Sequence, residues 1–145
     1  MKVAIGSDHA GLELKEKIKK FLDSKGIAYE DCGAHSMESC DYPDYVAKVA
    51  GAVASGRCER GIFVCKTGAG TSMAANKVKG IRACQVFSVE AARLSREHND
   101  ANFLALGDMQ PHDTVMSIVD AWLATKFSNE ERHRRRIKKL HDLER

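Results

Sequence analysis

Short apolar runs alternate with segments of helical periodicity along the whole chain. The β-branched run at 61–65 is typical of a buried strand, whereas the apolar residues between 12 and 22 recur on one helix face. Glycines at 26, 56 and 80 follow the helical segments and act as stop signals. The pattern predicts strands at 2–7, 27–31, 61–65, 81–87 and 102–106, and helices at 10–25, 42–56, 72–77, 89–97, 115–123 and 129–143.

Five alternations of strand and helix predict a single parallel sheet, wound by right-handed crossovers and covered by helices on both faces. The expected fold is one Rossmann-like α/β domain over 1–145, with five strands and an extra C-terminal helix. The pattern does not give the order of the strands. In such folds a ligand lies outside the carboxyl ends of the strands, near the point where the winding reverses.

Composition narrows the class of protein. With 145 residues, 43% of them hydrophobic, the chain can form one domain with a proper core. Its net charge of +3 is modest and its charges are interspersed, which does not favour a nucleic-acid binder. The five cysteines form no Cys-x-x-Cys pair, so a reducing cytoplasm fits better than a disulfide framework or a zinc site. No leader pattern or membrane-length apolar run is present, so we expect a soluble cytoplasmic protein.

A cysteine lies where the central predicted strand ends. Cys65 follows the apolar run and precedes the Gly68-Ala69-Gly70 turn, which leads into a helix-compatible segment. A loop that opens a helix presents unpaired backbone N–H groups to anything negative. Cys65 is therefore a candidate reactive thiol beside an anion site. The alternative is a buried cysteine that packs as a small apolar side chain.

Polar and titratable residues also follow other predicted strands. Asp8 and His9 come directly after the first strand, and His98 and Asn99 come downstream of the fourth. We assign these residues, with the segment that begins at Cys65, to the turns at the carboxyl ends of the sheet. Asp8 could instead serve only as a helix cap, and a loop histidine is commonly a surface or structural residue.

Several familiar motifs are absent. The first strand is not followed by Gly-x-Gly-x-x-Gly, and no Gly-x-x-x-x-Gly-Lys-Ser/Thr run is present. The six histidines include no His-Glu-x-x-His, and His133 and His141 are too isolated to form a metal pair on one helix face. Dinucleotide-dependent, kinase and metalloenzyme activities are therefore disfavoured.

Six segments in collinear order resemble one known family. They are Ala4-Ile5-Gly6-Ser7-Asp8-His9-Ala10-Gly11, Asp41-Tyr42-Pro43, the run from Cys65 to Lys77, Gly80-Ile81-Arg82-Ala83, the run from Ser95 to Asn102, and Ile118-Val119-Asp120-Ala121-Trp122-Leu123. Together they closely resemble the ribose-5-phosphate isomerase B family of sugar-phosphate isomerases, over essentially the whole chain. The resemblance implies an aldose–ketose isomerase that needs no metal or cofactor and forms a cis-enediolate intermediate.

The resemblance also implies roles for individual residues. Cys65 is similar to the family's base, which transfers a proton between C1 and C2 of the sugar. Thr67 is similar to the family's hydroxyl residue that assists proton transfer at the neighbouring oxygen. His98 is similar to the acid that helps to open the sugar ring. The chemistry suits these residue types, because a helix N-terminus favours a thiolate and a histidine exchanges protons near neutral pH.

Further residues are expected to contact the substrate. By resemblance, Asn99 binds a sugar hydroxyl, and Asp8 and His9 also touch the substrate. The backbone of the loop Lys66, Gly68, Ala69 and Gly70 is expected to stabilise the enediolate oxygen, an effect commonly worth ~3 kcal/mol for each well-placed donor.

The C-terminal segment is rich in arginine and lysine, which raises the possibility of nucleic-acid binding. A solvated amphipathic helix fits better, because acidic residues moderate its charge and its inward stripe is apolar. Arg132 and Arg136 are four residues apart and match the family's phosphate-binding arginines. Because the family shares its active site between subunits, we expect a homodimer or tetramer.

Two departures from the family pattern concern the anion site. Lys66 replaces the glycine of the usual Cys-Gly-Thr-Gly run, and Met109 stands where the family commonly has arginine. Lysine cannot adopt glycine-only backbone angles cheaply, so either this position is unstrained or the loop has shifted. We hypothesise that Lys66 partly replaces the missing arginine.

Three functions remain open. Isomerisation of ribose 5-phosphate and ribulose 5-phosphate is the leading one, and the same reaction on a tetrose, allose or galactose phosphate is the second. The third is a noncatalytic sugar-phosphate-binding module. Cys65, Thr67 and His98 do not distinguish between the sugars, because they act only near C1, C2 and the ring oxygen.

Overall fold

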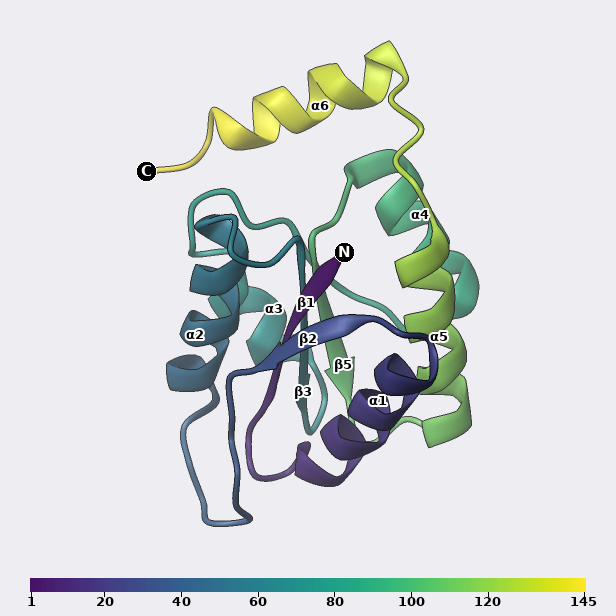
Figure 1. Ribbon diagram of the computed structural model, residues 1–145. Helices are drawn as coiled ribbons and strands as arrows, with labels where there is room; N and C mark the ends of the chain where they lie inside the picture. The colour runs from purple at the N-terminus through teal and green to yellow at the C-terminus, as the bar shows by residue number, and fades with distance from the viewer.

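The computed structural model describes residues 1–145 as one sheet with helices on both faces (Figure 1). The strands are β1 (Lys2–Ser7), β2 (Ala28–Asp31), β3 (Arg60–Cys65), β4 (Ala83–Gln85) and β5 (Phe103–Gly107). The helices are α1 (Leu12–Ser24), α2 (Tyr42–Ala54), α3 (Ala69–Ala75), α4 (Val89–Asn99), α5 (His112–Ala124) and α6 (Glu131–His141). The predicted order of elements is confirmed.

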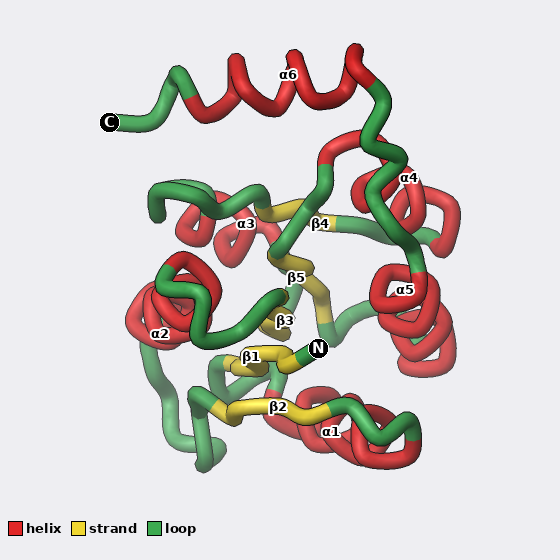
Figure 2. The backbone as a smooth tube through the Cα atoms, turned by 45° about the horizontal axis from the view of Figure 1, so that its top comes forward, coloured by secondary structure: helices red, strands yellow, loops and turns green.

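All neighbouring strands pair in parallel, in the order β2-β1-β3-β5-β4 (Figure 2). The winding reverses between β1 and β3, because β2 lies on one side of β1 and the later strands lie on the other. Such a reversal opens a crevice at the carboxyl ends of the two strands, where ligands bind. Asp8 follows β1 and Lys66 follows β3, so both lie at this crevice.

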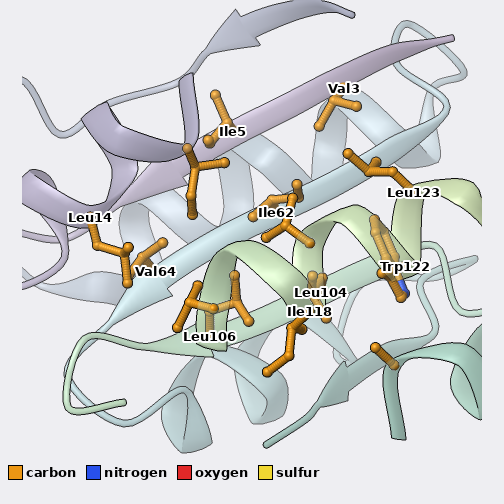
Figure 3. Packing of buried hydrophobic residues seen from close by; sticks show 14 of the residues in the cluster. Val3, Ile5, Leu14, Ile62, Val64, Leu104, Leu106, Ile118, Trp122 and Leu123 are labelled. Atoms are coloured by element: carbon orange, nitrogen blue, oxygen red, sulfur yellow. The ribbon is translucent and has the colours of Figure 1, made fainter. Parts of the chain in front are cut away.

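The side chains of alternate strand residues pack into two separate cores, because successive side chains point to opposite faces of a sheet. On one face, residues such as Ile5, Ile62 and Leu104 pack with α1, α4 and α5 (Figure 3). On the other face, residues such as Phe63, Cys65 and Phe103 pack with α2 and α3. The sulfur of Cys65 thus belongs to the side of the sheet that α3 covers.

The long loop from β2 to α2 extends past the carboxyl edge, at the lower left of Figure 1. Its base is fixed by Lys15 of α1, whose side chain is fully buried. The Lys15 ammonium donates to Asp31 Oδ1 at 2.9 Å and to the Ala34 carbonyl at 2.5 Å. A buried charge needs such partners, and here they tie the loop to the first helix.

The sixth helix lies at the opposite edge, across the top of Figures 1 and 2. It packs mainly against α4, and His133 is its only buried residue. Ile137, which was predicted on the inward stripe, is half-buried, and Leu140 is exposed. None of the six helices combines the length and apolar character needed to cross a membrane.

Candidate active site

The loops after β1 and β3 meet at the carboxyl edge. Ser7 is paired with Val64 in the sheet, and the Asp8 N–H donates to the Val64 carbonyl at 3.2 Å. This contact sets Asp8 and His9 beside the loop that begins at Lys66. The structure therefore brings together the residues that follow the first and third strands, as the sequence predicts.

Cys65 ends β3, and only 5% of its surface is exposed. Its Sγ atom accepts a hydrogen bond from the Gly68 N–H at 3.0 Å. A backbone donor aimed at the sulfur is the arrangement that a thiolate requires, whereas a merely apolar cysteine needs none. The sulfur thus lies in a polar turn although the rest of the residue belongs to the core.

Two glycines give the Cys65 loop its shape. Gly68 has φ +87°, in the left-handed region that favours glycine. A Cβ atom at Gly70 would lie 2.4 Å from the Tyr42 ring and hydroxyl, so the tyrosine packs directly on the start of α3. Neither glycine can take a side chain without moving its surroundings.

Lys66 replaces a family glycine without strain, because it is not among the residues with positive φ. Its carbonyl accepts the Met109 N–H at 3.2 Å, and the Cys65 carbonyl accepts the Asp108 N–H at 2.9 Å. The first of the two alternatives, an unstrained position, is therefore correct. The same hydrogen bonds place positions 66 and 109, the two departures from the family pattern, side by side.

Thr67 is exposed at the rim of the loop. Its Oγ1 accepts the Ala69 N–H at 3.3 Å, and its carbonyl accepts a hydrogen bond from the Gln85 side chain at 2.8 Å. Gln85 was not recognised from the sequence, because nothing in the run around it indicates that β4 supports the neighbouring loop.

The predicted donors of the loop are only partly free. Gly68 N–H is bound to Cys65 Sγ, and Ala69 N–H is bound to Thr67 Oγ1. The N–H groups of Lys66, Thr67 and Gly70 make no backbone hydrogen bond. Of the predicted N–H groups from Lys66 through Gly70, these three therefore remain available to an oxyanion.

Asp8 and His9 are each held by another part of the chain. Asp8 is buried, and its Oδ1 accepts the Gly11 N–H at 3.0 Å within the turn before α1. The N-cap of α1 is Gly11 and no side chain caps the helix, so the helix-cap alternative for Asp8 is wrong. His9 Nδ1 accepts the Cys40 N–H at 3.3 Å. A neutral His9 ring therefore carries its hydrogen on Nε2, which remains able to donate. The support from Cys40 was not foreseen, because Cys40 is 31 residues away in the sequence.

His98 and Asn99 do not join these residues within one chain. Both lie in the last turn of α4, which carries the chain back from the carboxyl end of β4 to the amino end of β5. Arg82, just before β4, donates to the Asn99 carbonyl at 3.1 Å and so fixes this turn at the amino edge. The prediction that His98 and Asn99 lie in a turn at the carboxyl edge is wrong.

The distance between the two edges is large. Six residues of β3 separate them, which is about 16 Å at ~3.3 Å per residue. No side chain spans this distance.

The amino-edge residues form a cluster of their own with α6. The rings of His98 and His133 stack with centroids 4.4 Å apart and planes 10° apart. Arg132 and Arg136 flank His133 along the helix and are exposed, and Arg132 Nε donates to Glu130 Oε2 at 2.9 Å. Arg136 forms no ion pair within the chain. His98, Asn99, Arg132 and Arg136 thus make a second, cationic group of predicted site residues.

A cavity of about 420 Å³ lies beneath α6 at this amino edge, away from Cys65. Its lining includes Asn99, Arg82 and His141, together with apolar residues at the end of α6. We do not identify it with the reaction centre, because it lacks the cysteine loop. Nowhere in the chain do three histidine, cysteine or acidic side chains come together in a group that could hold a metal ion.

Comparisons with known proteins place this geometry in context. Residues 3–140 match the family model described as ribose/galactose isomerase. The chain is 42% identical to ribose-5-phosphate isomerase B of Escherichia coli strain K12, over 99% of this chain and 96% of the relative. It is similar to the structure of Clostridium thermocellum ribose-5-phosphate isomerase B, with a TM-score of 0.96 and 51% identity over 99% of this chain and 97% of the other.

A second similar structure contains a ligand. It is ribose-5-phosphate isomerase B from Mycoplasma genitalium with bound ribulose-5-phosphate, and it matches with a TM-score of 0.92 and 39% identity. The match covers 97% of this chain and 94% of the other.

Proposed function

The chain belongs to the ribose/galactose isomerase family, and from this membership we propose that it interconverts ribose 5-phosphate and ribulose 5-phosphate through a cis-enediolate. The observation that carries the proposal is the hydrogen-bonded sulfur of Cys65 at the point where the winding of the sheet reverses. The same chemistry on another sugar phosphate is the alternative, because the residues around Cys65 act on C1 and C2 only.

In the proposed reaction Cys65 is the base. Its thiolate takes the proton from C2 of the open-chain aldose, and the electron pair of that bond forms the C1–C2 double bond as charge moves to the C1 oxygen. The Thr67 hydroxyl transfers the proton between the oxygen atoms on C2 and C1. The thiol then returns its proton to C1, which yields the ketose and regenerates the thiolate.

The loop provides donors where charge develops. The N–H groups of Lys66, Thr67 and Gly70 belong to the loop that follows Cys65 and make no backbone hydrogen bond, and each well-placed donor commonly contributes ~3 kcal/mol to an oxyanion. Gly68 and Ala69 support these donors indirectly, because their own N–H groups fix the sulfur and the threonine. His9 Nε2 offers a further donor from the loop after β1, and Asp8 holds that loop in place.

The remaining roles require a second copy of the chain. His98, Asn99, Arg132 and Arg136 lie at the amino edge, so they can serve Cys65 only from another subunit. We therefore propose a homodimer, or a tetramer built from such dimers. His98 of the partner subunit protonates the ring oxygen during ring opening, Asn99 of the partner subunit binds a hydroxyl, and the two arginines bind the phosphate.

The charge of α6 fits a phosphate ligand better than a nucleic acid. Arg135 is paired with Glu131 at 2.6 Å, and Lys138 with Asp142 at 3.2 Å, so much of the positive charge is compensated along the helix. Nucleic-acid binding depends on uncompensated cations arranged along a surface. Arg136, which is exposed and unpaired, is the cation most available to a single phosphate.

The proposed reaction predicts exchange of carbon-bound protons. The protein is incubated in heavy water with four-, five- and six-carbon aldose and ketose phosphates, and deuterium incorporation is followed by NMR. We expect incorporation together with interconversion of ribose and ribulose 5-phosphates. Turnover of a different sugar phosphate alone would show a different substrate specificity and would leave the proposed mechanism unchanged. Binding without exchange across the panel would favour the noncatalytic module instead.

Lys66→Ala is expected to weaken apparent substrate affinity about tenfold, with a smaller change in kcat, because an exposed cation next to position 109 would be lost. Steady-state kinetics give KM and kcat separately. The matched control is Lys20→Ala, which removes an exposed lysine of α1 outside the proposed site. An unchanged KM in the Lys66 variant would contradict the idea that Lys66 replaces the arginine missing at Met109.

A further inference from the structure

The contact between α4 and α6 is made through an unusual residue. His133 is the only buried residue of α6, with 4% of its surface exposed, and its ring lies flat against His98 at 4.4 Å. Its Nε2 atom is buried without a hydrogen-bond partner. An aliphatic side chain would dock the helix without this cost, so docking alone does not account for a flat ring at this position.

The surroundings of His133 keep this ring uncharged. Burial, followed by the nearby His98 on α4 and Arg132 on α6, lowers the pKa of His133 below its ordinary value. Arg136 acts in the same direction, and Glu130 is the one acidic group that opposes them. Near neutral pH the stack therefore contains a neutral His133 ring.

The position of His98 complements this arrangement. His98 lies in the last turn of α4, at the negative end of the helix dipole. A protonated imidazole is also attracted to the face of a neutral aromatic ring, whereas two charged rings would repel each other. The stack fixes the plane of the His98 ring and leaves its edge free.

We propose that His133 is a positioning residue for ring opening, which holds the imidazole of His98 in one plane. This inference rests on the proposed function, in which His98 of the partner subunit protonates the ring oxygen of the sugar. His133 itself does not touch the substrate.

Two variants separate the stacking role from simple docking of α6. His133→Leu keeps an apolar anchor and removes the flat face, whereas His133→Phe keeps a flat, uncharged ring. The control is Lys139→Ala, which removes an exposed side chain of the same helix that makes no hydrogen bond or ion pair within the chain. Thermal unfolding of each variant shows whether the fold and the docking of α6 are retained.

The two substrates provide the decisive readout. Ribose 5-phosphate is mostly a closed ring and must be opened, whereas ribulose 5-phosphate cannot close a five-membered ring because its C5 oxygen carries the phosphate. We expect His133→Leu to lower turnover of ribose 5-phosphate about tenfold or more, while deuterium exchange at C1 of ribulose 5-phosphate changes less than about twofold. His133→Phe should retain most of both activities.

The outcomes distinguish the inference from the proposed function. Equal activity of the leucine, phenylalanine and unaltered proteins on ribose 5-phosphate would overturn the positioning role. Equal losses on both substrates would also overturn it, because they would indicate a general structural effect. An unaltered protein that exchanges no proton with either substrate would instead overturn the proposed function.

Discussion

Replacing Cys65 by serine is expected to lower kcat by about 10²–10⁴-fold while the fold is retained, because the general base is lost. Serine is nearly the same size as cysteine, and its hydroxyl can still accept the Gly68 N–H that now binds Sγ at 3.0 Å. An alcohol is a far weaker acid than a thiol, so it provides almost no anion to take the C2 proton. Deuterium exchange measures the loss, and thermal unfolding measures the fold.

Cys58 provides the matched control for this variant. It is buried to a similar degree, with 2% of its surface exposed against 5% for Cys65, but it lies before β3 at the amino edge. Cys58→Ser should therefore cost some stability and leave turnover close to that of the unaltered protein. If the Cys65 variant retained near-normal exchange, another group would have to be the base.

The carboxyl-edge half of the site could be predicted because it is local in the sequence. The strand, the cysteine and the glycine turn follow one another within ten residues, and the ends of parallel strands meet at one edge. The supports of this half could not be predicted in the same way. Tyr42 against Gly70, Gln85 on Thr67 and Cys40 on His9 all depend on how distant segments pack.

The direction of the fourth helix explains the error over His98. The sequence predicted a helix over 89–97 and placed His98 in the turn beyond it, whereas α4 continues to Asn99. Had the alternation of strands and helices been followed strictly, the end of this helix would have been assigned to the amino edge, because each crossover helix runs against the strands. This signal was present in the sequence and was not used.

Two other boundaries differ for reasons of packing. The fourth strand was predicted over 81–87 but contains only Ala83–Gln85, because it lies at the edge of the sheet and pairs with β5 alone. The third helix was predicted from Ser72 but begins at Ala69, so Gly70 lies inside it. A glycine is normally read as part of a turn, and here it is needed because the Tyr42 ring occupies the space of a side chain.

Mixing Cys65→Ser chains with His98→Ala chains is expected to restore activity that neither variant has alone. In a dimer with shared sites, a mixed pair contains one site with both defects and one site with neither. One of the two sites in the purified mixed dimer is intact, so about half of the normal activity should return. The two chains are coexpressed with different tags, the mixed dimer is purified, and deuterium exchange is measured.

A mixture of Cys65→Ser with Thr67→Ala chains tests whether this recovery has the proposed origin. Cys65 ends β3 and Thr67 lies in the loop that follows it, so every site in that mixed dimer carries one of the two changes and activity should stay low. Recovery in the first mixture only would require Cys65 and His98 to come from different chains. No recovery in a verified mixed dimer would contradict the shared site. The separation of about 16 Å between the two edges would then leave His98 without a route to the sugar ring.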